Sequence, residues 1–191
     1  MHNSQKRTSR LISGTVIILA CLSAVTPVVM AGINEPPKKM DPTLEGKAGK
    51  YKASIIVNAT PMHTWNILTN YQAMAGKMPD IKDVKLLGRA GTTARIQQTY
   101  QAPYTFGLQI NATLEMQEVS PTQLIYRLIK GDQIRTLKGR WELTPLNGRT
   151  QLTHQIHIDP IVPNFVRPVY NELFEKNLRH SMAILKQMIE N

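Results

Sequence analysis

The sequence predicts an α+β fold, in which a curved antiparallel sheet of about seven strands packs against one long C-terminal helix. Residues 105–117 alternate polar and apolar side chains without exception, which is the pattern of a half-buried β-strand. From residue 168 to residue 189 the apolar residues recur instead with the period of an α-helix. A long sheet with a single helix to cover it tends to enclose space, and we place the function in that space.

The first 31 residues have the composition of a secretory signal peptide. Three basic residues precede an apolar stretch over residues 11–25, and a small-residue cleavage pattern ends at Ala31. Two alternatives stay open. Residues 11–31 are just long enough to serve as an uncleaved membrane anchor, and Cys21 resembles the acylated cysteine of a bacterial lipoprotein. We therefore expect an exported protein, periplasmic or secreted, which is membrane-anchored if this segment is retained.

Charge and cysteine content limit the partners of the mature chain. The whole chain has a net charge of +10, and the leader holds three basic residues and no acid, which leaves +7 after its removal. Cys21 is the only cysteine, so no disulfide bond can hold the mature fold. The basic residues are scattered, without the Arg-rich or aromatic-interleaved tracts of RNA readers. We expect either transient contact with an anionic membrane surface or a simply solvated surface, and we disfavour nucleic acid.

Four segments precede the main run of strands. They are a flexible linker, a first strand and two short helical segments, at residues 32–49, 51–59, 60–68 and 71–79. The linker is rich in Pro, Gly and charge and has no apolar period, so the folded domain is expected to span residues 50–191. Thr60 and Pro61 suit the N-cap and first position of a helix. Met62, Trp65 and Leu68, spaced three apart, lie on the stripe that this helix is expected to bury.

Six consecutive strands complete the predicted sheet. They span residues 81–87, 93–101, 105–119, 123–129, 133–144 and 150–159. Short turns rich in Gly, Asn, Asp and Ser join most of them, which favours antiparallel hairpins. Gly107 and Gly139 mark expected bends within the strands. The terminal helix is expected to bury a stripe from Val169 onward, with Pro168 either at a kink after a short turn from Asn164 or at the helix start.

Several local motifs accompany this order of elements. They are Ala59-Thr60-Pro61, Met78-Pro79, the run Gly-Arg-Trp-Glu-Leu-Thr-Pro at 139–145 and the run Gly-Arg-Thr-Gln-Leu-Thr at 148–153. Together with the element order they resemble the START-like (SRPBCC) superfamily. The similarity is to the polyketide cyclase/dehydrase and lipid-transport branch, which includes coenzyme-Q-binding START proteins. It spans residues 50–189 and implies a helix-grip fold.

The resemblance implies a cavity between the sheet and the helix that holds an apolar ligand, such as a lipid, a quinone or a polyketide-like molecule. Because this superfamily contains carriers and enzymes alike, the fold leaves the activity open. We expect non-enzymatic binding or transport without a cofactor. The first alternative is a cyclase or dehydratase that acts on a bound polyketone. The second, a ribosome- or RNA-associated binding module, conflicts with the predicted leader.

Strand alternation and the helical period place one set of side chains toward this space, and we expect them to bind the ligand. The set is Ile96, Gln98, Tyr100, Phe106, Leu108, Ile110, Leu114, Tyr126, His154, Tyr170, Phe174 and Met182. Its members are mostly apolar, with a few hydroxyl, amide and imidazole groups, as in ligand pockets generally. The alternative is that the same side chains meet the helix and fill an ordinary core.

His154 is the candidate for acid–base chemistry, because imidazole titrates near neutral pH. A hydrogen-bonded interior histidine is the commoner role, and relatives often have an aromatic residue here. His154 and His157 point to opposite faces of a strand and cannot share a metal. No other set has metal-ligand spacing, so we expect no metal. Asp80 has no identifiable partner, and Arg140 is expected on the wet face while Trp141 anchors the core.

Overall fold

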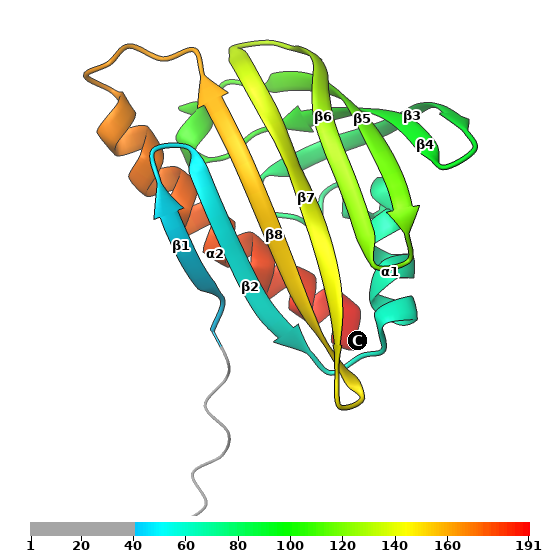
Figure 1. The fold of residues 1–191 in the computed structure, drawn as a ribbon. Helices are drawn as coiled ribbons and strands as arrows, with labels where there is room; N and C mark the ends of the chain where they lie inside the picture. Colours follow the sequence, from blue (N-terminus) through cyan, green and yellow to red (C-terminus); the bar gives the residue numbers. More distant parts are fainter. Residues whose placement is uncertain (1–40) are drawn as a thin grey trace, which may run out of the picture. The chain divides into compact units, whose positions relative to one another are not determined.

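The computed structural model describes residues 41–191, so the predicted leader and the first part of the predicted linker lie outside the described residues. An eight-stranded antiparallel sheet, in the order β1-β2-β8-β7-β6-β5-β4-β3, is crossed on one face by the long helix α2 (Figure 1). We call this covered face the inner face. Neither α-helix of the described part combines the length and apolar character needed to cross a membrane.

The strands are β1 (Thr43–Lys47), β2 (Lys50–Val57), β3 (Ile81–Ala90), β4 (Thr93–Tyr100), β5 (Ile110–Ser120), β6 (Gln123–Gly131), β7 (Ile134–Leu146) and β8 (Arg149–Pro160). The helices are α1 (Pro61–Thr69), the 3-10 turns η1 (Tyr71–Met74) and η2 (Pro103–Thr105), and α2 (Arg167–Glu190). The predicted α+β helix-grip fold is therefore confirmed, with one strand more than expected.

The additional strand, β1, lies within the predicted linker, which is therefore wrong for residues 43–47. It forms a hairpin with β2 through Ala48 and Gly49, whose φ angles are +52° and +87°. Two successive positive φ angles define the turn that best matches the twist of paired strands. Only Leu44 of this strand packs against the core. The segment therefore lacked the apolar period that would have revealed it.

The long alternating segment forms its strand later than predicted, because β5 begins only at Ile110. The hydroxyl of Thr105 accepts a hydrogen bond from the Ala102 N–H at 3.2 Å and donates one to the Ala102 carbonyl at 2.8 Å, which closes η2. Phe106 and Gly107 then follow with φ angles of +53° and +81°. A backbone in the left-handed conformation departs from the extended angles of a strand and ends it here. The alternation over residues 105–109 thus belongs to a turn, and the predicted bend at Gly107 lies outside the strand.

Helix α2 begins at Arg167, after a turn in which the Arg167 N–H donates to the Asn164 carbonyl at 3.3 Å. This arrangement matches the expected short turn from Asn164. Pro168 occupies the first helical turn, where the backbone N–H that it lacks would have had no partner within the helix. The buried stripe begins at Tyr170 and not at Val169, whose side chain is 51% exposed.

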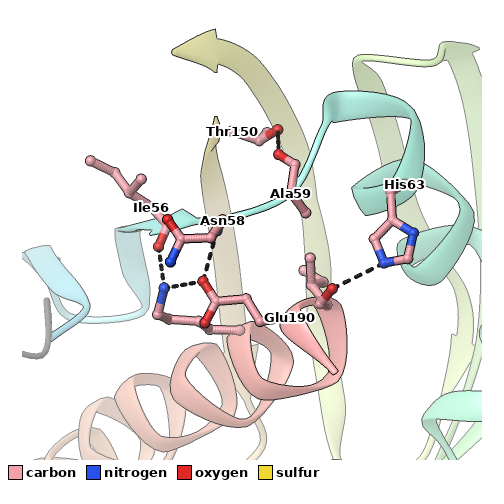
Figure 2. Close-up of polar contacts among 8 residues, drawn as sticks. Ile56, Asn58, Ala59, His63, Thr150 and Glu190 are labelled. Atoms are coloured by element: carbon pink, nitrogen blue, oxygen red, sulfur yellow. Dashed lines mark hydrogen bonds and ion pairs between the residues drawn. The ribbon is translucent and has the colours of Figure 1, made fainter. Parts of the chain in front are cut away.

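The C-terminal end of α2 is hydrogen-bonded to the end of β2 and to the segment that joins β2 to α1 (Figure 2). Lys186 Nζ donates to the Ile56 carbonyl oxygen at 2.7 Å and also bonds the Glu190 carboxylate. That carboxylate accepts a further hydrogen bond of 2.7 Å from the backbone N–H of Asn58. Although partial burial acts to raise it, the hydrogen bonds from Lys186 and Asn58 and the Lys186 charge lower the pKa of Glu190.

Helix α1 strengthens the same junction. Thr60 is the N-cap, as predicted, and its hydroxyl accepts from the His63 N–H at 3.3 Å. The His63 ring nitrogen Nε2 lies 3.0 Å from the carbonyl oxygen of Ile189 in α2 (Figure 2). Leu68 is buried as expected, whereas Met62 is 56% exposed. The predicted stripe is wrong at Met62 because the helix buries Thr64 and Leu68 on its core side.

Gly139 in β7 provides space for an aromatic ring. The register shifts in the β3–β4, β5–β6 and β7–β8 pairs do not occur at the bend expected there. Gly139 lies directly opposite Tyr126 of β6 and Ile156 of β8. A Cβ at position 139 would come 2.2 Å from the Gln155 carbonyl oxygen and 2.5 Å from the Tyr126 hydroxyl oxygen. Only glycine therefore allows the Tyr126 side chain to cross β7.

We expect Gly139→Ala to lower the free energy of unfolding by about 1–3 kcal/mol, because the new methyl group overlaps backbone and Tyr126 atoms. The matched control is Gly88→Ala in β3, where a Cβ would meet nothing within 4 Å. This control is expected to change stability by about 0.5 kcal/mol or less. Urea unfolding of both variants measures the difference, and equal stabilities would contradict the proposed crowding.

We expect Lys186→Met to lower the free energy of unfolding by about 1–2 kcal/mol, because it leaves the Ile56 carbonyl and the Glu190 carboxylate without their shared donor. Lys176→Met is the control, since Lys176 is an exposed residue of the same helix. Thermal unfolding compares the two variants. If both lose the same stability, the contacts of Lys186 do not secure the helix.

Candidate functional site

A cavity of about 210 Å³ lies between the inner face of the sheet and α2. A dry apolar cavity of roughly 150 Å³ accepts a benzene ring, so this space admits at least one ring or a short hydrocarbon segment. Its lining includes side chains of β4 to β8, of η2 and of α2. Of the two alternatives that the sequence left open, the structure therefore has the cavity and not the filled core.

The structure brings eleven of the twelve predicted ligand-binding residues to the wall of this cavity. The exception is Ile96, which is fully buried in the packed core and does not line the cavity. Phe106 and Leu108 line it at the rim and are 52% and 61% exposed, because the turn after η2 carries them out of the sheet. Contact of these residues with a ligand stays a prediction.

Helix α2 is divided along its length between cavity and core. The residues that line the cavity run from Tyr170 to Met182. Leu185 and Ile189, one and two turns further on, are 1% and 2% exposed and do not line the cavity. The hollow therefore lies under the N-terminal and middle turns, while the last turns are packed and tied down.

One polar group in the cavity wall is centred on His154 in β8. Its ring stacks on Trp141, the directly opposite residue of β7, with centroids 3.8 Å apart and planes at 3°. Its Nε2 is 2.7 Å from the hydroxyl oxygen of Tyr126, which reaches it across Gly139. Within residues 41–191, the buried Nδ1 atom of His154 has no hydrogen-bond partner.

Burial lowers the pKa of His154 to about 3. An imidazolium ion here would be desolvated without a counter-ion, which is costly. The ring is therefore neutral at pH 7, far from the pKa that suits general acid or base catalysis near neutrality. His154 is better suited to offering one polar atom to a bound molecule than to moving protons.

A second polar group surrounds Asp80, for which the sequence offered no partner. Tyr104 of η2 donates its hydroxyl hydrogen to Asp80 Oδ2 at 3.4 Å, and Ser181 of α2 donates to Oδ1 at 3.4 Å. Burial raises the pKa of Asp80, although these hydrogen bonds partly offset the effect. The carboxyl group lines the cavity, so it can meet a hydroxyl, amine or carbonyl group of a ligand.

The sequence interpretation missed Asp80, Tyr104, Trp141 and Ser181 as members of the site. Tyr104 and Ser181 follow Asp80 by 24 and 101 residues, so only the folded chain brings them together. One signal was present: Asn177 and Ser181 lie four residues apart within the apolar stripe of α2, and both are buried. Polar residues at such positions normally have a specific partner.

The remaining wall is apolar or carries neutral hydroxyl and amide groups. Tyr100 donates a hydrogen bond to the Gln98 side-chain oxygen. Burial, followed by the nearby Asp80 charge, raises the pKa of Tyr100 and of Tyr104, so both phenols stay protonated. No cluster of three or more His, Cys, Asp or Glu side chains suited to a metal ion occurs within residues 41–191.

A curved sheet that grips a C-terminal helix around an apolar hollow is the architecture of START-like proteins. Residues 48–190 match the family described as polyketide cyclase/dehydrase and lipid transport, and the chain belongs to this family. No curated protein matches the chain.

Solved structures share this architecture at low sequence identity. A START superfamily protein from Mycobacterium smegmatis is 18% identical with a TM-score of 0.62, covering 74% of this chain and 97% of its own. The Zhui aromatase/cyclase from Streptomyces is 18% identical with a TM-score of 0.57, and the match covers 71% of this chain and 90% of its own. A STAR-related lipid transfer protein from Xanthomonas axonopodis is 16% identical with a TM-score of 0.60, and the match covers 78% of this chain and 99% of its own. At these identities the similarity establishes the fold alone.

We expect His154→Phe to remove an acid-dependent loss of stability. The ordinary pKa of histidine is 6.5 and that of folded His154 about 3, so the unfolded chain binds the extra proton between these values. The free energy of unfolding of the unmutated protein then falls as the pH drops through this window, by at most about 1.4 kcal/mol per pH unit. Denaturant unfolding at about pH 7 and about pH 4.5 measures the effect.

Comparison of the wild-type protein with His154→Phe separates the effect of His154 on stability from that of Asp80. The raised pKa of Asp80 produces a slope of opposite sign, but it does so in both proteins and cancels in their difference. The stability difference between wild type and variant should therefore change steadily with pH. Parallel stability curves would show that His154 is not buried in its neutral form.

Proposed function

We propose that the protein binds and carries an apolar small molecule, such as a lipid, a quinone or a polyketide-like compound, without chemical change. The observation that carries this proposal is the cavity, with its largely apolar wall between the sheet and α2. Removal of apolar ligand surface from water contributes roughly 25 cal/mol per Å². No covalent step is required for such binding.

The two polar groups support a ligand with polar substituents on an apolar body. The groups around His154 and Asp80 both line the cavity. A few placed polar groups in a hydrophobic pocket fix the orientation of a ligand. The similarity to a STAR-related lipid transfer protein agrees with carriage of this kind of molecule.

The rim supports passage of such a ligand from an apolar environment. Phe106, Leu108 and Ile161 border the cavity and are 52%, 61% and 45% exposed. Exposed apolar side chains around an opening are a common mark of interaction sites. In our proposal they let an apolar ligand enter without first contacting charged surface.

One observation favours the alternative, a cyclase or dehydratase. Asp80 is a cavity-facing carboxyl group with a raised pKa and two hydroxyl neighbours, and such groups are the usual general acids and bases. The similarity to the Zhui aromatase/cyclase agrees with this reading. The neutral His154 ring does not contribute a proton-transfer partner at neutral pH.

We expect Leu178→Trp to abolish ligand binding, because the indole would occupy the cavity that Leu178 lines. Native mass spectrometry of protein purified from cells expressing the full chain, followed by solvent extraction, identifies any co-purified molecule. Titration with an apolar naphthalene dye gives the affinity, which is expected to fall at least about tenfold. The control, Val169→Trp, adds the same bulk at an exposed position of α2 and should bind normally.

We expect Asp80→Asn to separate the carrier from the enzyme. A carrier retains the dye and the co-purified molecule with an affinity changed by less than about tenfold, because the amide keeps the shape of the group and loses one hydrogen-bonding mode. An enzyme loses turnover of an offered polyketone while still binding it. Turnover by the wild-type protein that disappears in Asp80→Asn would overturn simple carriage.

A further inference from the structure

A row of basic side chains crosses the outer face of the sheet, opposite to α2. Its members are directly opposite one another on five neighbouring strands, β1, β2, β8, β7 and β6. We call this set the basic row: Lys47, Lys50, His157, Lys138 and Arg127. With strands about 4.8 Å apart, the row is about 19 Å long.

Strand alternation confirms that the basic row faces away from the cavity. The sequence neighbours Tyr51, Tyr126 and Leu137 are 4%, 6% and 4% exposed on the inner side. Lys47, Lys50, Lys138 and Arg127 are all exposed, and His157 is partly exposed. The row is therefore independent of the ligand cavity and accessible from solvent.

The basic row is electrostatically unfavourable for the isolated domain. Like charges directly opposite on adjacent strands destabilise a sheet. Within residues 41–191, Lys47, Lys50 and Lys138 have no carboxylate within ion-pair distance. Arg127 pairs with Glu115 of β5 at 2.6 Å. Side chains on this face do not fill the core, so packing does not explain why three of the five positions in the row carry lysine.

A shallow groove follows the basic row. Its lining includes Lys50, Arg127, Lys138 and His157 of the row but not Lys47, and Glu45, Lys52 and Arg140 lie beside them. The carboxylates nearby flank the row and do not interrupt it from β1 to β6. Arg140, for instance, pairs with Glu142 at 3.2 Å. The groove therefore presents basic side chains of β2, β8, β7 and β6 along one line.

We propose that the basic row binds a linear polyanion, a chain of successive phosphate groups on a flexible backbone that lies across the strands. Such a chain relieves the repulsion between the lysines and releases its own counter-ions on binding. Within residues 41–191, the row holds three lysines without an ion-pair partner, and a linear ligand can meet each of them in turn.

Two other anionic partners fit the geometry less well. Single-stranded nucleic acid binds through aromatic side chains on which its bases stack. Tyr51 and Tyr126 border the groove, but their side chains are buried on the inner side. A planar anionic membrane would contact a broader area that includes Glu142, four residues from Lys138 along β7, whereas a single chain along the row would not reach this carboxylate.

The test compares two double variants of the full chain with equal loss of charge. Lys50→Gln/Lys138→Gln removes two members of the basic row. Lys77→Gln/Lys176→Gln removes two exposed lysines from other surfaces. Fluorescence anisotropy with labelled inorganic polyphosphate, measured over a series of salt concentrations, gives the affinity and its salt dependence. Anionic lipid vesicles and single-stranded DNA of matched charge are the competing probes.

We expect the row variant to bind polyphosphate about tenfold more weakly than wild type, with a reduced slope of log affinity against log salt. The control variant should stay within about twofold of wild type. Equal weakening in both variants would show a diffuse charge effect and overturn the proposal. Tighter binding of DNA or of vesicles than of polyphosphate, lost in the row variant, would assign the row to that partner instead. Circular dichroism and thermal unfolding verify that both variants fold.

Discussion

The structure depends on how helix α2 meets the sheet, which is tight at one end and open at the other. At its C-terminal end, Leu185 and Ile189 are almost completely buried, and Lys186 and Glu190 bond the backbone at and just after the end of β2. From Tyr170 to Met182 the same helix borders a cavity. The cavity lacks the dispersion contacts of a filled core, so this part of the helix contributes less to stability. Close packing and hydrogen bonds at the C-terminal end offset this loss.

The polar group around His154 in the cavity wall depends on the absence of a side chain at position 139. Because Gly139 has no Cβ, the ring of Tyr126 can cross β7 and place its hydroxyl beside His154. Trp141 covers the imidazole ring by stacking. Burial then shifts both His154 and Asp80 toward their uncharged forms. The interior is thus suited to hydrogen bonding with a neutral ligand more than to binding an ion.

The fold could be predicted from the sequence because most of its elements have a regular apolar period. The same pattern placed nine wall residues on elements that face the cavity, while Phe106 and Leu108 line it from a turn. The pattern failed where local backbone geometry determines the structure. Phe106 follows an alternating pattern but adopts a left-handed conformation. Strand β1 is held by pairing with β2 more than by burial. The pattern also missed Asp80 and Ser181, since no local signal records which distant residues will meet.

Strands β1 and β3 are the two edge strands of the sheet, because each pairs with only one neighbour. β1 is only five residues long. β3 carries two register shifts, near Asp83 and Gly88, and lysines at positions 82 and 85. Short, irregular and charged edge strands are poor templates for intermolecular pairing. An open sheet with such edges is therefore protected against edge-to-edge pairing between molecules.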